Sequence, residues 1–212
     1  MKFLAHRGRW FQVEEKNSLS AIQSAFEHGY GIETDIRDFN GQLVISHNVA
    51  TEESPSAREM LKIYRETGCE SMLALNVKAD GIQVLLEPLL EEYQIKNYYL
   101  FDMSIPELIV NEAQGLRYYT RHSDVEPVCV MYDRAAGVWM DSFYDEQWLK
   151  TDAIAEHLQA GKEVAIVSPE LHGKEHLETW RRLKESGLTD AENLYLCTDR
   201  PDEAKEYFYG EN

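Results

Sequence analysis

Short apolar runs alternate with amphipathic stretches along almost the whole chain. Eight runs have the apolar, β-branched and aromatic character of buried strands, and they cover residues 2–6, 31–37, 72–78, 97–102, 116–121, 137–141, 163–168 and 193–198. Between them, seven segments carry an apolar residue at about every third or fourth position, and these are residues 19–28, 57–67, 82–93, 106–113, 146–160, 174–185 and 202–208. The alternation predicts repeated βα units and a parallel sheet.

The number of predicted strands favours a single (β/α)8 TIM barrel, an α/β fold, formed by residues 1–212 as one domain. Glycines such as Gly29 and Gly161 follow predicted helices, where a left-handed residue often ends the helix. Residues 125–134 form the least helical connection, and periodicity alone leaves a six-stranded open sheet as the alternative. We find no linker or low-complexity tract that would divide the chain.

The charge of the chain changes the range of expected partners. Its 38 acidic and 21 basic residues give a formal net charge of -17, which repels nucleic acid and anionic membrane surfaces at long range. An anionic substrate must then meet a local cationic pocket or a bound metal. The alternative is that the acidic surface serves solubility alone.

The cysteines and the amino terminus bear on the cellular compartment. Cys69, Cys129 and Cys197 are odd in number and lack C-x-x-C spacing, which favours a reducing compartment and argues against a disulfide framework or a zinc cluster. The amino terminus lacks the apolar stretch of a signal peptide, and no later segment resembles a membrane span. We therefore expect a cytoplasmic protein without stable membrane association.

Two carboxylates lie near the end of the second predicted strand. Glu33 and Asp35 are two residues apart, so on a strand they point to the same face. In a (β/α)8 barrel the chemistry takes place at the carboxyl ends of the strands. Such a carboxylate pair is costly unless it shares a hard cation such as Mg²⁺ or Ca²⁺, or cationic side chains surround it. The alternative is a solvated pair at a sheet edge.

Basic residues also follow the predicted strand ends. His6 follows the first strand, and His47 follows a second short extended run at residues 42–46. Two such imidazoles suit the proton transfers of phosphodiester cleavage, each worth about 10²–10⁴ in rate. Arg7 and Lys78 can neutralise phosphate oxygens. The alternatives are structural histidines and ordinary surface ion pairs.

In their order along the chain, these motifs resemble the glycerophosphodiester phosphodiesterase family. The matching segments are His6-Arg7-Gly8, Asn17-Ser18, Glu33-x-Asp35, Asn40-Gly41 leading to His47, Lys78, and the late run Cys197-Thr198-Asp199-Arg200-Pro201-Asp202. The resemblance implies a phospholipase C-like barrel that cleaves a glycerol-type phosphodiester. It also implies that His6 and His47 are the acid–base pair, that Arg7 and Lys78 contact phosphate, and that Glu33 and Asp35 bind a metal.

Three positions depart from the family pattern. Lys16 stands where a glutamate is usual, Asn76 replaces a third metal-binding carboxylate, and Asn48 replaces the aspartate after the second histidine. A neutral Asn76 would weaken a Mg²⁺ or Ca²⁺ site formed with Glu33 and Asp35. Lys16 instead could take the place of the cation as a substrate-binding charge, as in related bacterial phosphoinositide lipases. A one-residue shift that brings Glu15 into the site would remove this alternative.

Other polar residues are weaker candidates. Five residues at later strand ends could contact the alcohol part of a substrate or could be ordinary loop residues, and these are Arg121, His122, Asp141, Glu170 and His172. Three histidines fall within helical patterns, where we expect solvated surface, and these are His28, His157 and His176.

These observations favour an active phosphodiesterase acting on a small soluble glycerol-type diester. The alternative is a binding or regulatory module that keeps the phosphate pocket but has lost efficient catalysis. Two retained histidines favour the enzyme, because a binding module does not need two proton-transfer groups. An unrelated barrel enzyme, such as an isomerase, would explain the strand number but not the ordered motifs. The sequence leaves the oligomeric state open.

Overall fold

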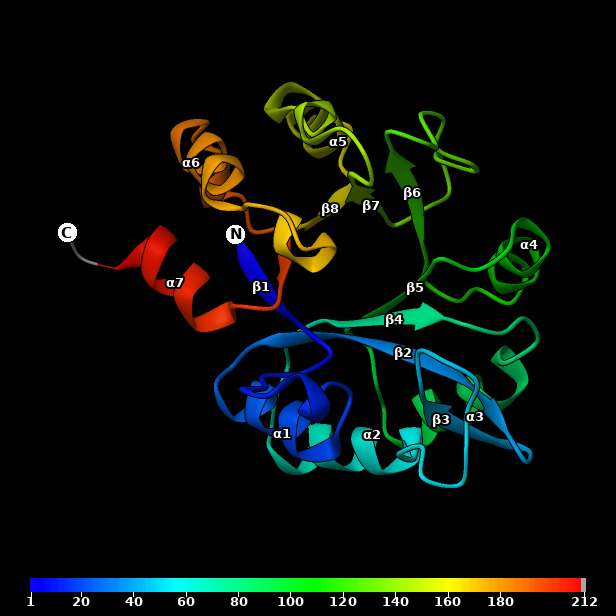
Figure 1. Ribbon diagram of the computed structural model, residues 1–212. Helices are drawn as coiled ribbons and strands as arrows, with labels where there is room; N and C mark the ends of the chain where they lie inside the picture. Colours follow the sequence, from blue (N-terminus) through cyan, green and yellow to red (C-terminus); the bar gives the residue numbers. More distant parts are fainter. Residues whose placement is uncertain (211–212) are drawn as a thin grey trace. The chain divides into compact units, whose positions relative to one another are not determined.

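The computed structural model describes residues 1–210, and by its contacts the chain divides into two compact units (Figure 1). The amino-terminal unit is Ala5–Tyr118, and the carboxy-terminal unit combines Met1–Leu4 with the chain from Tyr119 onward. The first strand, β1 (Lys2–His6), contributes residues to both units. The prediction that residues 1–212 form one domain stays a prediction.

In the amino-terminal unit, parallel strands alternate with helices. The strands β5, β4, β2 and β1 are neighbours in that order, and β3 pairs antiparallel with β2. The elements are η1 (Val13–Glu15), α1 (Leu19–Glu27), β2 (Gly31–Phe39), β3 (Gln42–Ile45), α2 (Ala57–Glu66), β4 (Leu73–Val77), α3 (Gln83–Glu92), β5 (Tyr98–Phe101) and α4 (Ile105–Ala113).

Burial explains why these segments form strands and helices. All five residues of β4 are buried, as expected for a parallel strand that is covered on both faces. The helix α1 packs against β2 and α2 (Figure 1), with the rings of Phe26 and Tyr64 5.1 Å apart. Ser18 caps α1 by accepting a hydrogen bond from the Ala21 backbone N–H, a contact typically worth about 1 kcal/mol.

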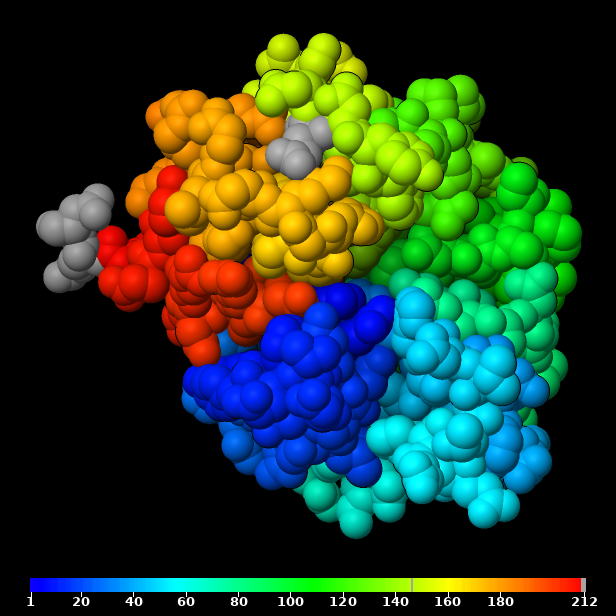
Figure 2. Space-filling model, in the orientation of Figure 1, coloured from blue at the N-terminus to red at the C-terminus, as the bar shows by residue number. Residues whose placement is uncertain are grey.

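The carboxy-terminal unit repeats the same alternation. Its strands run in the order β1, β9, β8, β7 and β6, and α6 and α7 lie side by side (Figures 1 and 2) with the rings of Trp180 and Phe208 5.7 Å apart. The elements are β6 (Tyr119–Ser123), β7 (Gly137–Asp141), η2 (Glu146–Trp148), α5 (Thr151–Gln159), β8 (Glu163–Val167), η3 (Pro169–His172), α6 (Leu177–Glu185), η4 (Leu188–Asp190), β9 (Leu194–Thr198) and α7 (Pro201–Tyr209).

The predicted alternation is confirmed, because residues 1–210 contain eight parallel strands and seven α-helices in the (β/α)8 order of a TIM-barrel-like α/β fold. The six-stranded alternative is therefore wrong. The segment predicted as one helix at residues 146–160 is η2 followed by α5. Among the described residues, the connection between β6 and β7 contains no α-helix, as its weak periodicity indicated.

Two of the three helical histidines differ from expectation. His28 is exposed, but His157 and His176 are buried. The ring of His176 packs on Trp180 with centroids 4.3 Å apart. This aromatic contact stabilises the buried position of the imidazole. The three cysteines are free. Within residues 1–210, no helix is both long enough and apolar enough to cross a bilayer.

Candidate active site

The register of three strands in the amino-terminal unit brings several predicted site residues together. Glu33 and Asp35 lie on the same face of β2. Asp35 is the register partner of Asn76 on β4, and Asn76 is the partner of Phe101 on β5. Asp102 follows directly after β5. Polar side chains from three neighbouring strand ends therefore meet at one edge of the sheet.

The loop after β1 is held in an uncommon backbone conformation beside these strands. Arg7 has a φ of 59° and Gly8 a φ of 94°, in the left-handed region that non-glycine residues rarely adopt. At Gly8 a side chain would also collide with helix α1, because a Cβ atom would lie 2.7 Å from the Ala21 carbonyl carbon. The Arg7 backbone N–H donates to the Glu33 carbonyl at 2.8 Å, and its carbonyl accepts from Asn17 at 2.8 Å.

Asp35 is the electrostatic centre of this group. Its side chain is fully buried, with Arg7 Nε 2.9 Å from Oδ2 and Lys78 Nζ 3.3 Å from Oδ1. Asn17 Nδ2 donates to Asp35 Oδ2 at 2.9 Å, and Thr34 Oγ1 donates to Asn17 Oδ1 at 2.8 Å. The two cations keep about a fifth of their side-chain surface exposed, so they can contact an anion while they remain paired with Asp35.

Glu33 lies in a less polar environment than Asp35. Burial and, to a smaller extent, the charge of Asp35 together raise the pKa of Glu33 to about 8, against the opposing effects of Arg7 and Lys78. His6 Nε2 lies 3.7 Å from Glu33 Oε2. The His6 backbone carbonyl accepts a hydrogen bond from Trp10 Nε1 at 2.9 Å. A histidine and a carboxyl group with a raised pKa therefore lie side by side.

Asn76 connects two carboxylates in this site. Its Nδ2 donates to Glu33 Oε1 and to Asp102 Oδ2, both at 3.3 Å. We did not predict Asp102 as a site residue, although it directly follows the apolar run Tyr-Tyr-Leu-Phe. That position after the strand was the signal that could have identified it.

Buried oxygen atoms that accept no hydrogen bond test whether a hard cation fits these residues. Among the described residues, buried side-chain atoms without a hydrogen-bond partner include Glu33 Oε2, Asp35 Oδ1 and Asn76 Oδ1. Carboxylate and amide oxygens are the ligands that Mg²⁺ and Ca²⁺ prefer. Asp35 Oδ1 already faces Lys78, and the Asn76 nitrogen faces two carboxylates. The donor set therefore fits a divalent cation, provided that Asn76 presents its oxygen.

Two further predicted site residues have other partners. His47 is exposed after β3, and its Nδ1 donates to Asn48 Oδ1 at 3.0 Å. Lys16 Nζ lies 4.4 Å from the centre of the Trp10 ring, a cation–π contact. Within residues 1–210, His47 makes no ion pair or hydrogen bond with the carboxylates of β2.

Glu15 is used by the local turn before α1. Its carboxylate accepts hydrogen bonds from the backbone N–H groups of Phe11 at 2.8 Å and Gln12 at 3.1 Å, which lowers its pKa. The bond from Gln12 belongs to the capping box of η1. Glu15 therefore stabilises this turn, which argues against the one-residue shift that would bring its carboxylate to Glu33 and Asp35.

The weaker candidates form separate pairs in the carboxy-terminal unit. His172 Nε2 lies 2.7 Å from Asp141 Oδ1, and this hydrogen bond raises the pKa of His172. Glu170 accepts hydrogen bonds from Ser168 and Thr198. Asp141, Glu170 and His172 therefore each form hydrogen bonds within the carboxy-terminal unit.

Arg121 and His122 both lie within β6, because this strand is Tyr119–Ser123, whereas the predicted strand at residues 116–121 ended at Arg121. Arg121 forms an ion pair with Glu126. His122 Nδ1 shares a hydrogen bond of 3.0 Å with His157 Nε2 of α5. Burial and, to a smaller extent, the nearby His122 together lower the pKa of His157 to about 4. The pair is therefore neutral near pH 7.

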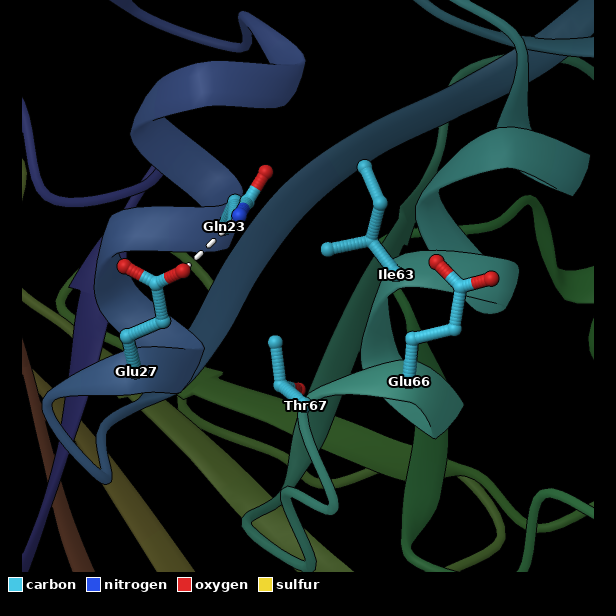
Figure 3. A pocket seen from close by; sticks show the side chains of 5 residues that line it. All are labelled: Gln23, Glu27, Ile63, Glu66 and Thr67. Atoms are coloured by element: carbon cyan, nitrogen blue, oxygen red, sulfur yellow. Dashed lines mark hydrogen bonds between the residues drawn. The ribbon is translucent and has the colours of Figure 1, made fainter.

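A surface pocket of about 400 Å³ lies between α1 and α2 (Figure 3). Gln23 donates to Glu27 at 2.8 Å on one side, and Glu66 lies on the other. The two carboxylates would repel a phosphodiester, and no residue from the strand ends lines this pocket. The pocket is therefore a poor candidate for the substrate site.

Solved structures of glycerophosphodiester phosphodiesterases share this fold. The enzyme from Parabacteroides distasonis matches with a TM-score of 0.73 at 15% identity, over 98% of this chain and 96% of that chain. The enzyme from Agrobacterium tumefaciens matches with a TM-score of 0.70 at 16% identity, over 98% of each chain.

A phosphodiesterase from Oleispira antarctica, in complex with the product sn-glycerol-3-phosphate, matches with a TM-score of 0.70 at 14% identity, over 98% of this chain and 96% of that chain. No family model and no curated protein matches the sequence. The chain therefore has the TIM-barrel-like fold of glycerophosphodiester phosphodiesterases, and the likeness is one of structure.

Proposed function

We propose that this chain is a phosphodiesterase that hydrolyses a small soluble glycerol-type phosphodiester to a phosphomonoester and an alcohol. The observation that carries the proposal is the group of His6, Arg7, Glu33, Asp35 and Lys78, which lies at neighbouring strand ends of the amino-terminal unit. The shared fold supports the same class of reaction. The product in the Oleispira antarctica structure suggests a glycerol phosphate as one half of the substrate.

In this proposal, Arg7 and Lys78 bind the non-bridging phosphate oxygens. Asp35 holds both side chains at defined positions through its two carboxylate oxygens. The planar guanidinium of Arg7 can bind two oxygens, and Lys78 adds a single positive charge. A phosphodiester carries one negative charge, so the pair would stabilise it despite the acidic surface.

His6 is the proposed proton-transfer group nearest the phosphate-binding cations. Hydrolysis forms a bond from a water oxygen to phosphorus and breaks the bond from phosphorus to the alcohol oxygen, which must gain a proton. The carboxyl group of Glu33 beside His6 would orient the imidazole, and in its ionised form it would stabilise the protonated imidazole. We assign the second proton transfer to His47, which must exchange its bond with Asn48 for contact with the substrate.

A divalent cation would be held by Glu33, Asp35 and Asn76, with Asp102 beside Asn76. When bound, Mg²⁺ or Ca²⁺ would neutralise the carboxylates and polarise a phosphate oxygen. Lys16 is the alternative source of positive charge, and its contact with Trp10 lies next to the loop that carries His6. If a divalent cation supplies the charge, a chelator should abolish turnover. If Lys16 supplies it, turnover should survive the chelator.

The test is hydrolysis of a panel of glycerophosphodiesters, together with a chromogenic diester, with Mg²⁺, Ca²⁺ or a chelator. We expect turnover of at least one glycerophosphodiester, and loss of turnover in Arg7→Ala through weaker substrate binding. Exposed Arg58 forms an ion pair with Glu92, and Arg58→Ala is the matched control. Absence of turnover under all conditions would reject the enzyme assignment.

A binding module is the second candidate, and the partners of Asn76 and His47 favour it. An amide nitrogen faces the carboxylates where a third acid would bind a metal, and His47 is bonded to Asn48. This candidate predicts that glycerophosphodiesters bind in an Arg7-dependent manner and are not hydrolysed. Calorimetric titration with the same panel therefore separates the candidates.

A further inference from the structure

A second cluster of metal-binding residue types lies in the carboxy-terminal unit. His122 on β6, Cys129 in the following loop and His157 on α5 each offer one ligand atom, and these atoms all lie within 4.8 Å of one another. We propose that these three side chains bind one zinc-class divalent ion that fastens the β6–β7 loop to α5. This site is independent of the proposed phosphodiesterase function.

The spacing of the ligand atoms suits a tetrahedral ion. Zinc binds imidazole nitrogen at about 2.0–2.1 Å and thiolate sulfur at about 2.3 Å, so two ligands of one ion lie about 3–4 Å apart. His122 Nδ1 and His157 Nε2 already lie 3.0 Å apart. Small rotations of the side chains would bring the Cys129 sulfur within the same range. Three protein ligands leave the fourth position to solvent.

Groups behind the two imidazoles can orient them toward a metal. The Tyr132 hydroxyl shares a hydrogen bond of 2.9 Å with His157 Nδ1, which is the ring nitrogen that faces away from His122. The His122 ring donates to the Pro127 backbone carbonyl. A hydroxyl can either donate or accept, so Tyr132 would also stabilise the tautomer that leaves His157 Nε2 free to bind. Metal-binding histidines commonly have such second partners.

The chemistry of the cluster selects a different ion from the candidate active site. Two imidazoles and a thiolate are ligands for zinc and other soft or borderline metals, whereas carboxylate and amide oxygens favour Mg²⁺ or Ca²⁺. Cys129 is partly exposed, so an ion from solvent can reach it.

The position of the cluster indicates what the ion would do. In the described chain, the connection between β6 and β7 has no α-helix, and Cys129 and Tyr132 both lie in it. In the other βα units a helix packs on the sheet after the strand, but no α-helix holds the described β6–β7 loop in this way. An ion shared by β6, the loop and α5 would supply that constraint, because the binding of a metal contributes to the stability of the segments that it connects.

The experiment is a titration of the chelator-treated full chain with Zn²⁺ against a chromophoric chelator, followed by Co²⁺ as a spectroscopic probe. We expect one tight site and a near-ultraviolet absorption from thiolate bound to cobalt. Cys129→Ser should abolish that absorption, and both Cys129→Ser and His157→Gln should weaken zinc binding by about 100-fold or more. Tyr132→Phe should weaken it by about 10-fold.

Matched variants separate this site from other cysteines, histidines and carboxylates. Cys69→Ser and His28→Gln change a cysteine and a histidine in the other unit, and Glu33→Gln changes the candidate active site. All three should leave the cobalt absorption unchanged. Absorption that is absent from the wild type, that survives in Cys129→Ser, or that disappears in Cys69→Ser would overturn the proposal. Cys129→Ser alters a partly exposed loop residue, so circular dichroism should show an intact fold.

Discussion

The two clusters of the molecule are assembled in similar ways but carry different charges. In the amino-terminal unit, the cations Arg7 and Lys78 form ion pairs with Asp35, and Asn76 donates hydrogen bonds to Glu33 and Asp102. In the carboxy-terminal unit, a strand, a loop and a helix bring together two neutral histidines and a thiol, which are His122, His157 and Cys129. The first cluster is an electrostatic network, and the second is a neutral hydrogen-bonded one.

Burial affects the two clusters in opposite ways, because a buried site favours the uncharged form of each group. It is the largest cause of the shifts that raise the pKa of Glu33 to about 8 and lower the pKa of His157 to about 4. A protonated carboxyl group must lose its proton before it binds a cation, whereas a neutral imidazole is already in its binding form. We call Glu33, Asp35, Asn76 and Asp102 the oxygen cluster, and His122, Cys129 and His157 the His/Cys cluster. Cation binding by the oxygen cluster should therefore depend on pH near neutrality. Metal binding by the histidines of the His/Cys cluster should depend on pH less.

The largest expected difference between the clusters is catalytic. We predict that His6→Ala and His47→Ala each lower phosphodiester turnover by about 10²–10⁴-fold, because each removes a proposed proton-transfer group. Zinc binding by the other cluster should not change. Steady-state kinetics measures the first effect, and His28→Ala on the exposed end of α1 is the control. Full turnover in either variant would contradict the acid–base assignment of that histidine.

The second prediction concerns the free energy of unfolding. Asp35→Asn keeps the side-chain size but leaves Arg7 and Lys78 without their shared anion, so it should lower this free energy by about 3–5 kcal/mol. Asp38→Asn, at an exposed position of the same strand, should change it by less than about 0.5 kcal/mol. Urea denaturation measures both values. Equal effects of the two substitutions would mean that the buried ion pairs do not stabilise the unit.

The fold could be predicted from the sequence because its signals are local. Each strand is a short apolar run between helical stretches, and the structure confirms all eight. The carboxylate pair of the candidate active site also follows from local pattern, since alternation along β2 puts Glu33 and Asp35 on one face. Because the chemistry of a (β/α)8 barrel takes place at the carboxyl ends of its strands, the positions of His6, Arg7 and Lys78 predicted that they belong to the same site.

Contacts between distant segments were harder to predict. His157 lies in an ordinary amphipathic pattern, and only the packing of α5 on β6 shows that it meets His122. The absence of C-x-x-C spacing argued against a zinc cluster, but three ligands from a strand, a loop and a helix need no fixed spacing. We predicted that this strand ends at residue 121, but β6 ends two residues later, at Ser123. The prediction therefore missed that His122 lies within the strand. Side-chain partners such as Asn48 for His47 leave no sequence signal of their own.

The third prediction tests the effect of burial on Glu33. Between pH 4.5 and about 8, the unfolded chain has lost the Glu33 proton while the folded chain retains it, so this group lowers stability as pH rises. From pH 6 to pH 7.5 its contribution should fall by about 2 kcal/mol relative to Glu33→Gln. Denaturation at the two pH values, for both proteins, measures the difference. Parallel changes in the two proteins would show that Glu33 ionises normally.

The smallest expected effect concerns Asn76, and it asks whether the oxygen cluster binds a divalent cation. Asn76→Glu adds a carboxylate beside Glu33 and Asp102, so it should tighten Mg²⁺ or Ca²⁺ binding by about 10-fold. Calorimetric titration measures the affinity. Gln42→Glu is the control, because it adds the same charge at the exposed start of β3 and should leave the affinity unchanged.

Turnover with and without chelator then separates the two sources of positive charge. If the cation assists the reaction, chelation should abolish wild-type turnover, and Asn76→Glu should preserve turnover at lower metal concentrations. If Lys16 supplies the charge, wild-type turnover should survive chelation, and the added carboxylate should lower it. Since Asn76 is the register partner of Asp35, a substitution that changes neither affinity nor turnover would exclude Asn76 from the cation site. The oxygen cluster would then resemble the His/Cys cluster in one respect, because neutral hydrogen bonds at Asn76 would hold its carboxylates without an ion.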